Sequence, residues 1–95
     1  MKFHVLISKA AKLDISETFH WYEDRSSGLG SKFETELSEA LEELTYEPYK
    51  FQIKYRDIRI NFLNRFPYGI HFQILEVSSS TLILAIFHTS RKSLK

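Results

Sequence analysis

Residues 65–74, RFPYGIHFQI, alternate between apolar and polar side chains behind a proline. Three apolar residues of this stretch fall on one face of a strand: Ile70, Phe72 and Ile74. The opposite face carries Gly69, His71 and Gln73. A period of two with one apolar face is typical of a strand buried on one side, and Pro67 suits the turn before it. The stretch therefore predicts a sheet whose apolar face is covered by another element of the chain.

Two amphipathic helices precede this strand and can supply the cover. In the first, Ser8 is a candidate N-cap, and the apolar stripe consists of Ala11, Ile15, Phe19 or Thr18, and Tyr22. The stripe of the second helix recurs at intervals of four and three: Leu29, Phe33, Leu37, Leu41 and Leu44. Gly28 can adopt the left-handed conformation that ends the first helix, and Pro48 stops the second. So short a link predicts an antiparallel helical hairpin.

Three further segments have the pattern of strands. Residues 2–8 and 58–63 alternate, and residues 82–87, LILAIF, are apolar on both faces, as expected of a central strand. The order β-α-α-β-β-β predicts an α+β fold in which a small, mostly antiparallel sheet carries an α-helical hairpin packed on one face. No repeat or linker interrupts this order, so we expect a single domain over residues 1–95.

Composition excludes several classes of site. The chain has no cysteine, which rules out a disulfide framework and a thiolate metal site. Its four histidines fall on different predicted elements without ligand spacing, and GLG at 28–30 follows a helix rather than a strand. We therefore expect neither a metal nor a cofactor. No apolar run approaches the length of a membrane span, which favours a soluble cytoplasmic protein.

Charge is distributed unevenly along the chain. Residues 1–49 carry five Lys or Arg against ten Asp or Glu, a net charge of −5, whereas residues 50–95 carry eight against two, a net charge of +6. One interpretation is a basic face for an anionic partner. The other is that acidic helices neutralise a basic sheet within one domain, and composition does not separate the two.

Polar residues of the strands suggest a candidate site on the uncovered side of the sheet. We expect that side to carry Arg59, Asn61, His71, Gln73 and His88, with Arg65 and Arg91 at its edges. Arginine and histidine are the residues that metal-free RNA cleavage needs, as cation and as proton donor or acceptor. Any half-exposed sheet also alternates polar residues outward, and residue types alone favour this second interpretation.

Three segments together resemble the RelE/ParE superfamily of type II toxin–antitoxin toxins. They are AKLDISETFHWYEDRSSGLGSKF (11–33), LNRFPYGIHFQI (63–74) and LILAIFHTSR (82–91), and the resemblance extends over residues 5 to 91 in the right order. It implies a bacterial growth-inhibiting toxin with an antiparallel sheet backed by a helical hairpin. It also implies a cognate antitoxin, through which alone the pair would contact operator DNA.

The resemblance leaves two mechanisms in competition. RelE-like members cleave messenger RNA on the ribosome, and ParE-like members inhibit DNA gyrase by protein contact. RelE-like nucleases carry an arginine where this chain has Gly69, which we expect to leave a gap, and residues 89–95 contain no aromatic residue. The sequence therefore favours a ParE-like toxin that is not an enzyme. The alternatives are a metal-independent endoribonuclease, with His88, Arg91 and Arg65 as its catalytic residues, or an inactive antitoxin-binding member.

Antitoxin binding is the partner prediction common to all three alternatives. A toxin with an acidic hairpin and a basic sheet suits an antitoxin tail that combines apolar anchors with acidic groups. The candidate contacts for those acidic groups are Arg59, Arg65 and Arg91.

Overall fold

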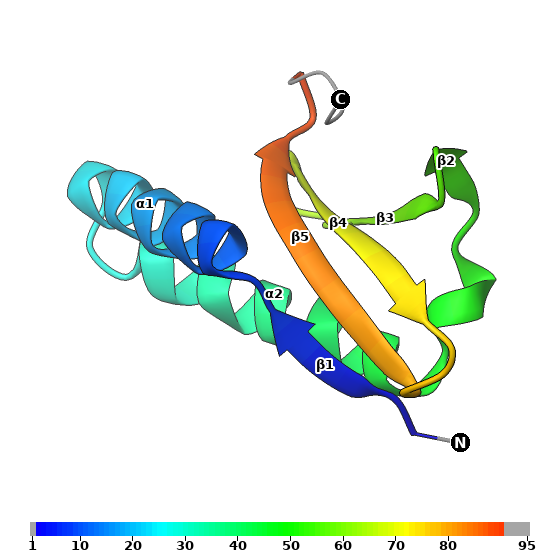
Figure 1. Ribbon diagram of the computed structural model, residues 1–95. Helices are drawn as coiled ribbons and strands as arrows, with labels where there is room; N and C mark the ends of the chain where they lie inside the picture. Colours follow the sequence, from blue (N-terminus) through cyan, green and yellow to red (C-terminus); the bar gives the residue numbers. More distant parts are fainter. Residues whose placement is uncertain (1, 91–95) are drawn as a thin grey trace.

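The computed structural model describes residues 2–90, which form a sheet with two helices on one of its faces (Figure 1). The elements follow in the order β1 (His4–Ile7), α1 (Lys9–Arg25), α2 (Leu29–Tyr46), the 3-10 helix η1 (Pro48–Lys50), β2 (Ile53–Tyr55), β3 (Ile58–Phe62), β4 (Tyr68–Leu75) and β5 (Ser80–His88). The predicted α+β class, the order of the main elements and the hairpin on one face are confirmed. The 3-10 helix η1 and the three-residue strand β2 were not predicted.

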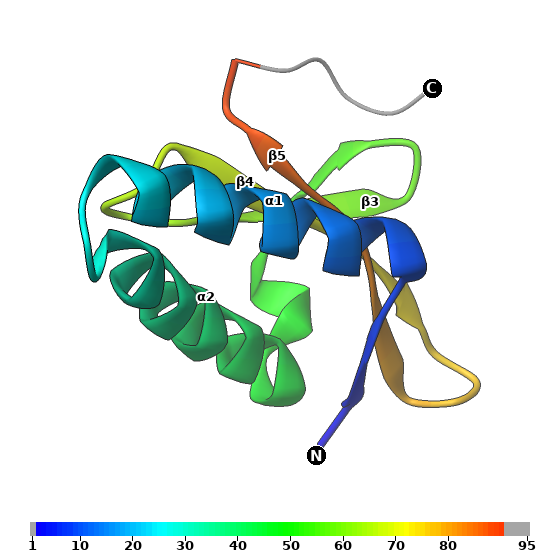
Figure 2. The ribbon, with the colours of Figure 1, turned by 90° about the vertical axis from the view of Figure 1, so that its left-hand side faces the viewer.

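The sheet has the strand order β1-β5-β4-β3-β2. β1 runs parallel to β5, and the other neighbouring pairs are antiparallel. In Figure 2 the two helices lie side by side in front of the strands. We call the sheet face turned toward them the hairpin face and the opposite one the outer face.

Local signals explain how α1 begins and how the hairpin turns. The Ser8 hydroxyl accepts a hydrogen bond from the backbone N–H of Ala11 at 3.0 Å, which confirms the predicted cap. Gly28 has a φ of 89°, in the left-handed region. A carboxylate from α1, that of Glu23, accepts the N–H groups of Gly28 and Gly30 at 2.8 and 3.0 Å. The amide groups of the GLG segment therefore already hold an anion from the chain itself.

The core lies between the hairpin and the hairpin face of the sheet. It contains Phe33, Leu37 and Leu44 from α2, with Ile70, Phe72, Ile83 and Ile86 from β4 and β5. The rings of Tyr22, Phe33, Phe66 and Tyr68 pack against one another at the turn end of the hairpin. The predicted stripes of both helices and the apolar side of 70–74 therefore supply this core.

β3 is oriented opposite to our expectation. Asn61 pairs with Ile70 and Arg59 with Phe72, so both polar residues lie on the hairpin face. A shift of one residue in strand phase turns every side chain to the other face. Ile60 and Phe62, which pair with His71 and Gly69, consequently lie on the outer face.

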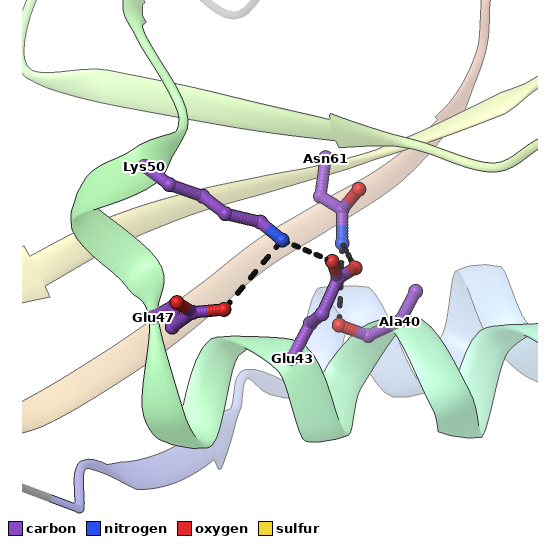
Figure 3. Close-up of polar contacts among 5 residues, drawn as sticks. All are labelled: Ala40, Glu43, Glu47, Lys50 and Asn61. Carbon is purple, nitrogen blue, oxygen red and sulfur yellow. Dashed lines mark hydrogen bonds and ion pairs between the residues drawn. The ribbon is translucent and has the colours of Figure 1, made fainter.

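Polar bonds to α2 account for this orientation (Figure 3). The side-chain amide of Asn61 donates to the Ala40 carbonyl at 3.2 Å and to a carboxylate oxygen of Glu43 at 3.3 Å. The other oxygen of Glu43 pairs with Lys50 at 2.5 Å, and this contact raises the pKa of the Lys50 ammonium. Because Asn61 is only 5% exposed, these bonds replace the water that its amide would otherwise need.

Further side-chain bonds join the hairpin to the sheet. The Thr81 hydroxyl donates to the Leu44 carbonyl at 3.1 Å. Where β1 ends, α1 continues along the edge of β5: the Ser8 hydroxyl donates to the Leu84 carbonyl, and Asp14 accepts the Ile86 N–H at 3.0 Å. None of the helices in the described part of the chain is long and apolar enough to cross a membrane.

Candidate functional site

The polar residues expected on one face of the sheet lie on two. His71 and Gln73 are on the outer face, as predicted. His88 pairs with Tyr68, whose ring packs on Tyr22 of α1, so His88 lies on the hairpin side together with Arg59 and Asn61. The fifth-strand histidine and the third-strand arginine were therefore predicted on the wrong face. Arg91 lies outside the described residues.

Arg59 and Arg65 occupy separate parts of the hairpin side. The Arg59 guanidinium donates to the Phe51 carbonyl at 2.6 Å and lies 5.2 Å from the centre of the Tyr49 ring. Arg65 is exposed in the loop between β3 and β4, where Glu36 accepts its backbone N–H. No described residue accepts a hydrogen bond from the Arg65 guanidinium, which borders a depression of about 360 Å³ along α2. Arg65 is therefore free to meet an acidic partner, whereas Arg59 already holds a loop in place.

Gly69 leaves no gap on the outer face, contrary to our expectation. A Cβ added to this glycine would lie 2.8 Å from Cγ2 of Ile60 and 3.1 Å from Cδ1 of Phe62. These two β3 side chains turn outward because Asn61 turns inward, and they cover the position. An arginine here would have to displace both.

The outer face also contains a buried histidine. His71 is 5% exposed; its Nδ1 lies 2.8 Å from the Tyr55 hydroxyl, and its ring lies 5.0 Å from that of Phe87. Burial lowers the pKa of His71 below its ordinary value, because the charged imidazolium loses its hydration in this environment. His71 is consequently a neutral hydrogen-bond partner of β2 near neutral pH.

His88 lies at a cleft between α1 and the ends of β4 and β5. Its Nδ1 accepts the Ser90 N–H at 3.1 Å, and its ring contacts Tyr68 edge to face at 5.2 Å. The cleft, of about 200 Å³, is also bordered by Asp14, Glu17, Thr18 and Trp21 of α1. No lysine or arginine of the described chain lines this cleft. His88 therefore lies among carboxylates and hydroxyls, and no described lysine or arginine beside it could bind a phosphate.

Several of these features escaped sequence reasoning. Tyr55 was overlooked because β2 is too short to show a period. The cleft residues of α1 were overlooked because Thr18 was considered only as a member of a helical stripe. The available signal for the orientation of β3 was Asn61 itself. A side-chain amide on a buried face needs a hydrogen-bond partner, and α2 supplies one on the hairpin face.

The sequence matches the family described as the ParE toxin of the type II toxin–antitoxin system, parDE, over residues 5–93. No curated protein matches it. Two solved structures share the fold. The chromosomal ParDE toxin–antitoxin system from P. aeruginosa has a TM-score of 0.81 at 15% identity, with 92% of this chain and 96% of that chain covered. The toxin–antitoxin complex RelBE2 from Mycobacterium tuberculosis has a TM-score of 0.69 at 16% identity, with 93% and 99% covered.

Because the family match extends over nearly the whole sequence, the chain belongs to the ParE toxin family. It is a toxin of the ParE/RelE type, as the resemblance implied.

Proposed function

We propose that this toxin arrests bacterial growth by binding a protein target in the cytoplasm, DNA gyrase being the target typical of ParE-like members, and that a cognate antitoxin neutralises it. The observation that carries the choice between mechanisms is the covered position at Gly69. In the nucleases of the superfamily this position supplies a cation for the reacting phosphate. Here Ile60 and Phe62 fill the space instead.

The rest of the outer face supports the same choice. Its paired positions around Gly69 are Ile60, Phe62, His71, Ala85 and Phe87, none of which is positively charged when His71 is neutral. Removing one transition-state contact of the oxyanion-hole type lowers a rate by about two to three orders of magnitude. The surroundings of Gly69 therefore lack the cation that phosphate chemistry needs, and Phe62, which is 50% exposed, is available for protein contact.

Neutralisation by an antitoxin is supported by the free guanidinium of Arg65. It can pair with an acidic residue of an antitoxin without breaking a bond within the described chain. Arg59 is the weaker candidate because it would have to share its donors with the Phe51 carbonyl. Arg91 stays a prediction for the same role.

A supercoiling assay with purified gyrase tests the proposed target. We expect the protein to inhibit supercoiling and the antitoxin to restore it. Growth arrest in cells whose gyrase is insensitive to the toxin would overturn the gyrase assignment.

Mapping of 5′ ends on messenger RNA in a translation extract tests the ribonuclease alternative. The gyrase proposal predicts no new ends, whereas ends abolished by His88→Ala would establish the nuclease. Induction without the antitoxin distinguishes both from an inactive member, which would not arrest growth.

A further inference from the structure

The cleft between α1 and the ends of β4 and β5 has an acidic lining. Asp14 uses one carboxylate oxygen for the Ile86 N–H, and Glu17 is exposed and has no partner in the described chain. The nearest guanidinium on the same helix, that of Arg25, lies over the Trp21 ring at 3.3 Å and does not line the cleft. The cleft therefore presents negative charge that no described cation neutralises.

The hydroxyl of a largely buried residue points to a ligand as well. Thr18 is 7% exposed and lines the cleft, yet its hydroxyl makes no hydrogen bond within residues 2–90. No fully buried side-chain oxygen in that range lacks a partner, so the small exposed part of Thr18 includes this oxygen. Tyr68 also lines the cleft, and its hydroxyl likewise makes no hydrogen bond within residues 2–90.

The arrangement discriminates among ligands. The lining offers two carboxylates, two hydroxyls and the His88 ring, and it contains no lysine or arginine of the described chain, so its charge favours a cationic ligand over phosphates and other anions. The described residues contain no group of three or more His, Asp or Glu side chains placed to hold a metal ion. A planar guanidinium carries five donors in a fixed fork and suits several acceptors better than an ammonium does.

We propose that this cleft binds an arginine side chain presented by a partner polypeptide, with Glu17 as its ion-pairing residue and the Thr18 and Tyr68 hydroxyls as its orienting acceptors. The small volume admits one side chain rather than a segment of chain. Such an arginine would be an anchor within a larger interface, because a single buried arginine often contributes a large part of the binding energy.

The test is direct because Trp21, which borders the cleft, is the single tryptophan of the sequence. The chain is titrated with N-acetyl-arginine amide at constant ionic strength while Trp21 emission is recorded. We expect a saturable change with a Kd on the order of millimolar, since one side chain supplies little affinity by itself. The neutral isostere N-acetyl-citrulline amide should bind at least about tenfold more weakly. Equal responses to the two amides, or no saturation, would overturn the proposal.

Variants separate binding from folding. Glu17→Gln should weaken arginine binding about tenfold. Glu34 is an exposed glutamate on α2 without a partner in residues 2–90, so Glu34→Gln should leave the binding unchanged. Thr18→Val keeps the shape and removes the acceptor, so it should weaken binding about threefold without lowering the melting temperature. A Thr18→Val protein that binds normally but melts earlier would assign Thr18 a structural role instead.

This inference does not depend on the cellular target. Loss of gyrase inhibition with intact arginine binding would refute the proposed function alone. Loss of arginine binding with intact inhibition would refute the cleft alone.

Discussion

Replacing Asn61 with alanine tests what orients β3. The substitution removes two hydrogen bonds to α2. The bond to the Ala40 carbonyl is neutral and buried, and is worth about 1 kcal/mol. The bond to Glu43 is charge-assisted, but that side chain is 42% exposed, so solvent screening reduces it to about 1 kcal/mol as well. We therefore expect Asn61→Ala to lower the free energy of unfolding by about 2 kcal/mol.

Urea denaturation followed by circular dichroism measures this loss. In a protein of this size it corresponds to a fall of about 10 °C in melting temperature. A double-mutant cycle with Glu43→Ala should give a coupling free energy of about 1 kcal/mol between the two sites. Glu42→Ala is the matched control, because this exposed neighbour makes no bond to the sheet and should change stability by less than about 0.5 kcal/mol.

A small loss of stability would contradict this role of Asn61. If Asn61→Ala costs under about 0.5 kcal/mol and the cycle shows no coupling, the polar contacts do not orient β3. The outward direction of Ile60 and Phe62 would then need another cause.

The structure predicts the effects of four further substitutions. Gly30→Ala should lower the free energy of unfolding by about 3 kcal/mol, because its Cβ would lie 2.7 Å from the Phe19 carbonyl oxygen. Gly28→Ala should cost only about 1 kcal/mol, since it meets strain at a φ of 89° and no neighbouring atom; urea titrations giving the reverse order would contradict both. The pKa of His71 is lower in the folded protein than in the unfolded chain. As pH drops below about 6.5, the unfolded chain therefore takes up this proton first, and the free energy of unfolding of the wild type should fall. His71→Gln should show a smaller fall in thermal melts between pH 7.5 and pH 5.5, and an identical pH dependence would assign the loss to other groups. Ser8→Ala should lower the free energy of unfolding by about 1 to 2 kcal/mol, because it removes both the α1 cap and the bond to the Leu84 carbonyl. An unchanged urea midpoint would argue against both roles.

Most of the fold could be predicted because its elements repeat with regular periods. The leucine stripe of α2 specified both the helix and the side that faces the sheet. In α1, Thr18 was correctly placed as an alternative to Phe19 in the buried stripe. Pro48, Ser8 and Gly28 marked boundaries for local reasons that do not depend on distant contacts.

The candidate site was less accessible because it depends on contacts between distant elements. Alternation in β3 is the same whichever face is buried, and the Asn61 contacts with Ala40 and Glu43 join residues 21 and 18 positions apart. Gly69 is covered because β3 turns Ile60 and Phe62 to the outer face. The cleft between α1 and β5 forms because β1 ends and α1 continues along the edge of β5. His88 was placed with the wrong neighbours, and its role as a site residue stays a prediction.

The pairing of β1 with β5 determines when, during its synthesis, the toxin can finish folding. Residues of the hairpin turn contact partners five to seven positions away, so this unit can form early during synthesis. β1 has β5 as its neighbour in the sheet, and Ser8 bonds to a carbonyl 76 residues further along the chain. A nascent chain therefore cannot complete its sheet until translation has passed β5, and closing so long a loop is a slow step in folding. The proposed antitoxin would thus have the interval before this closure in which to meet an unfinished toxin.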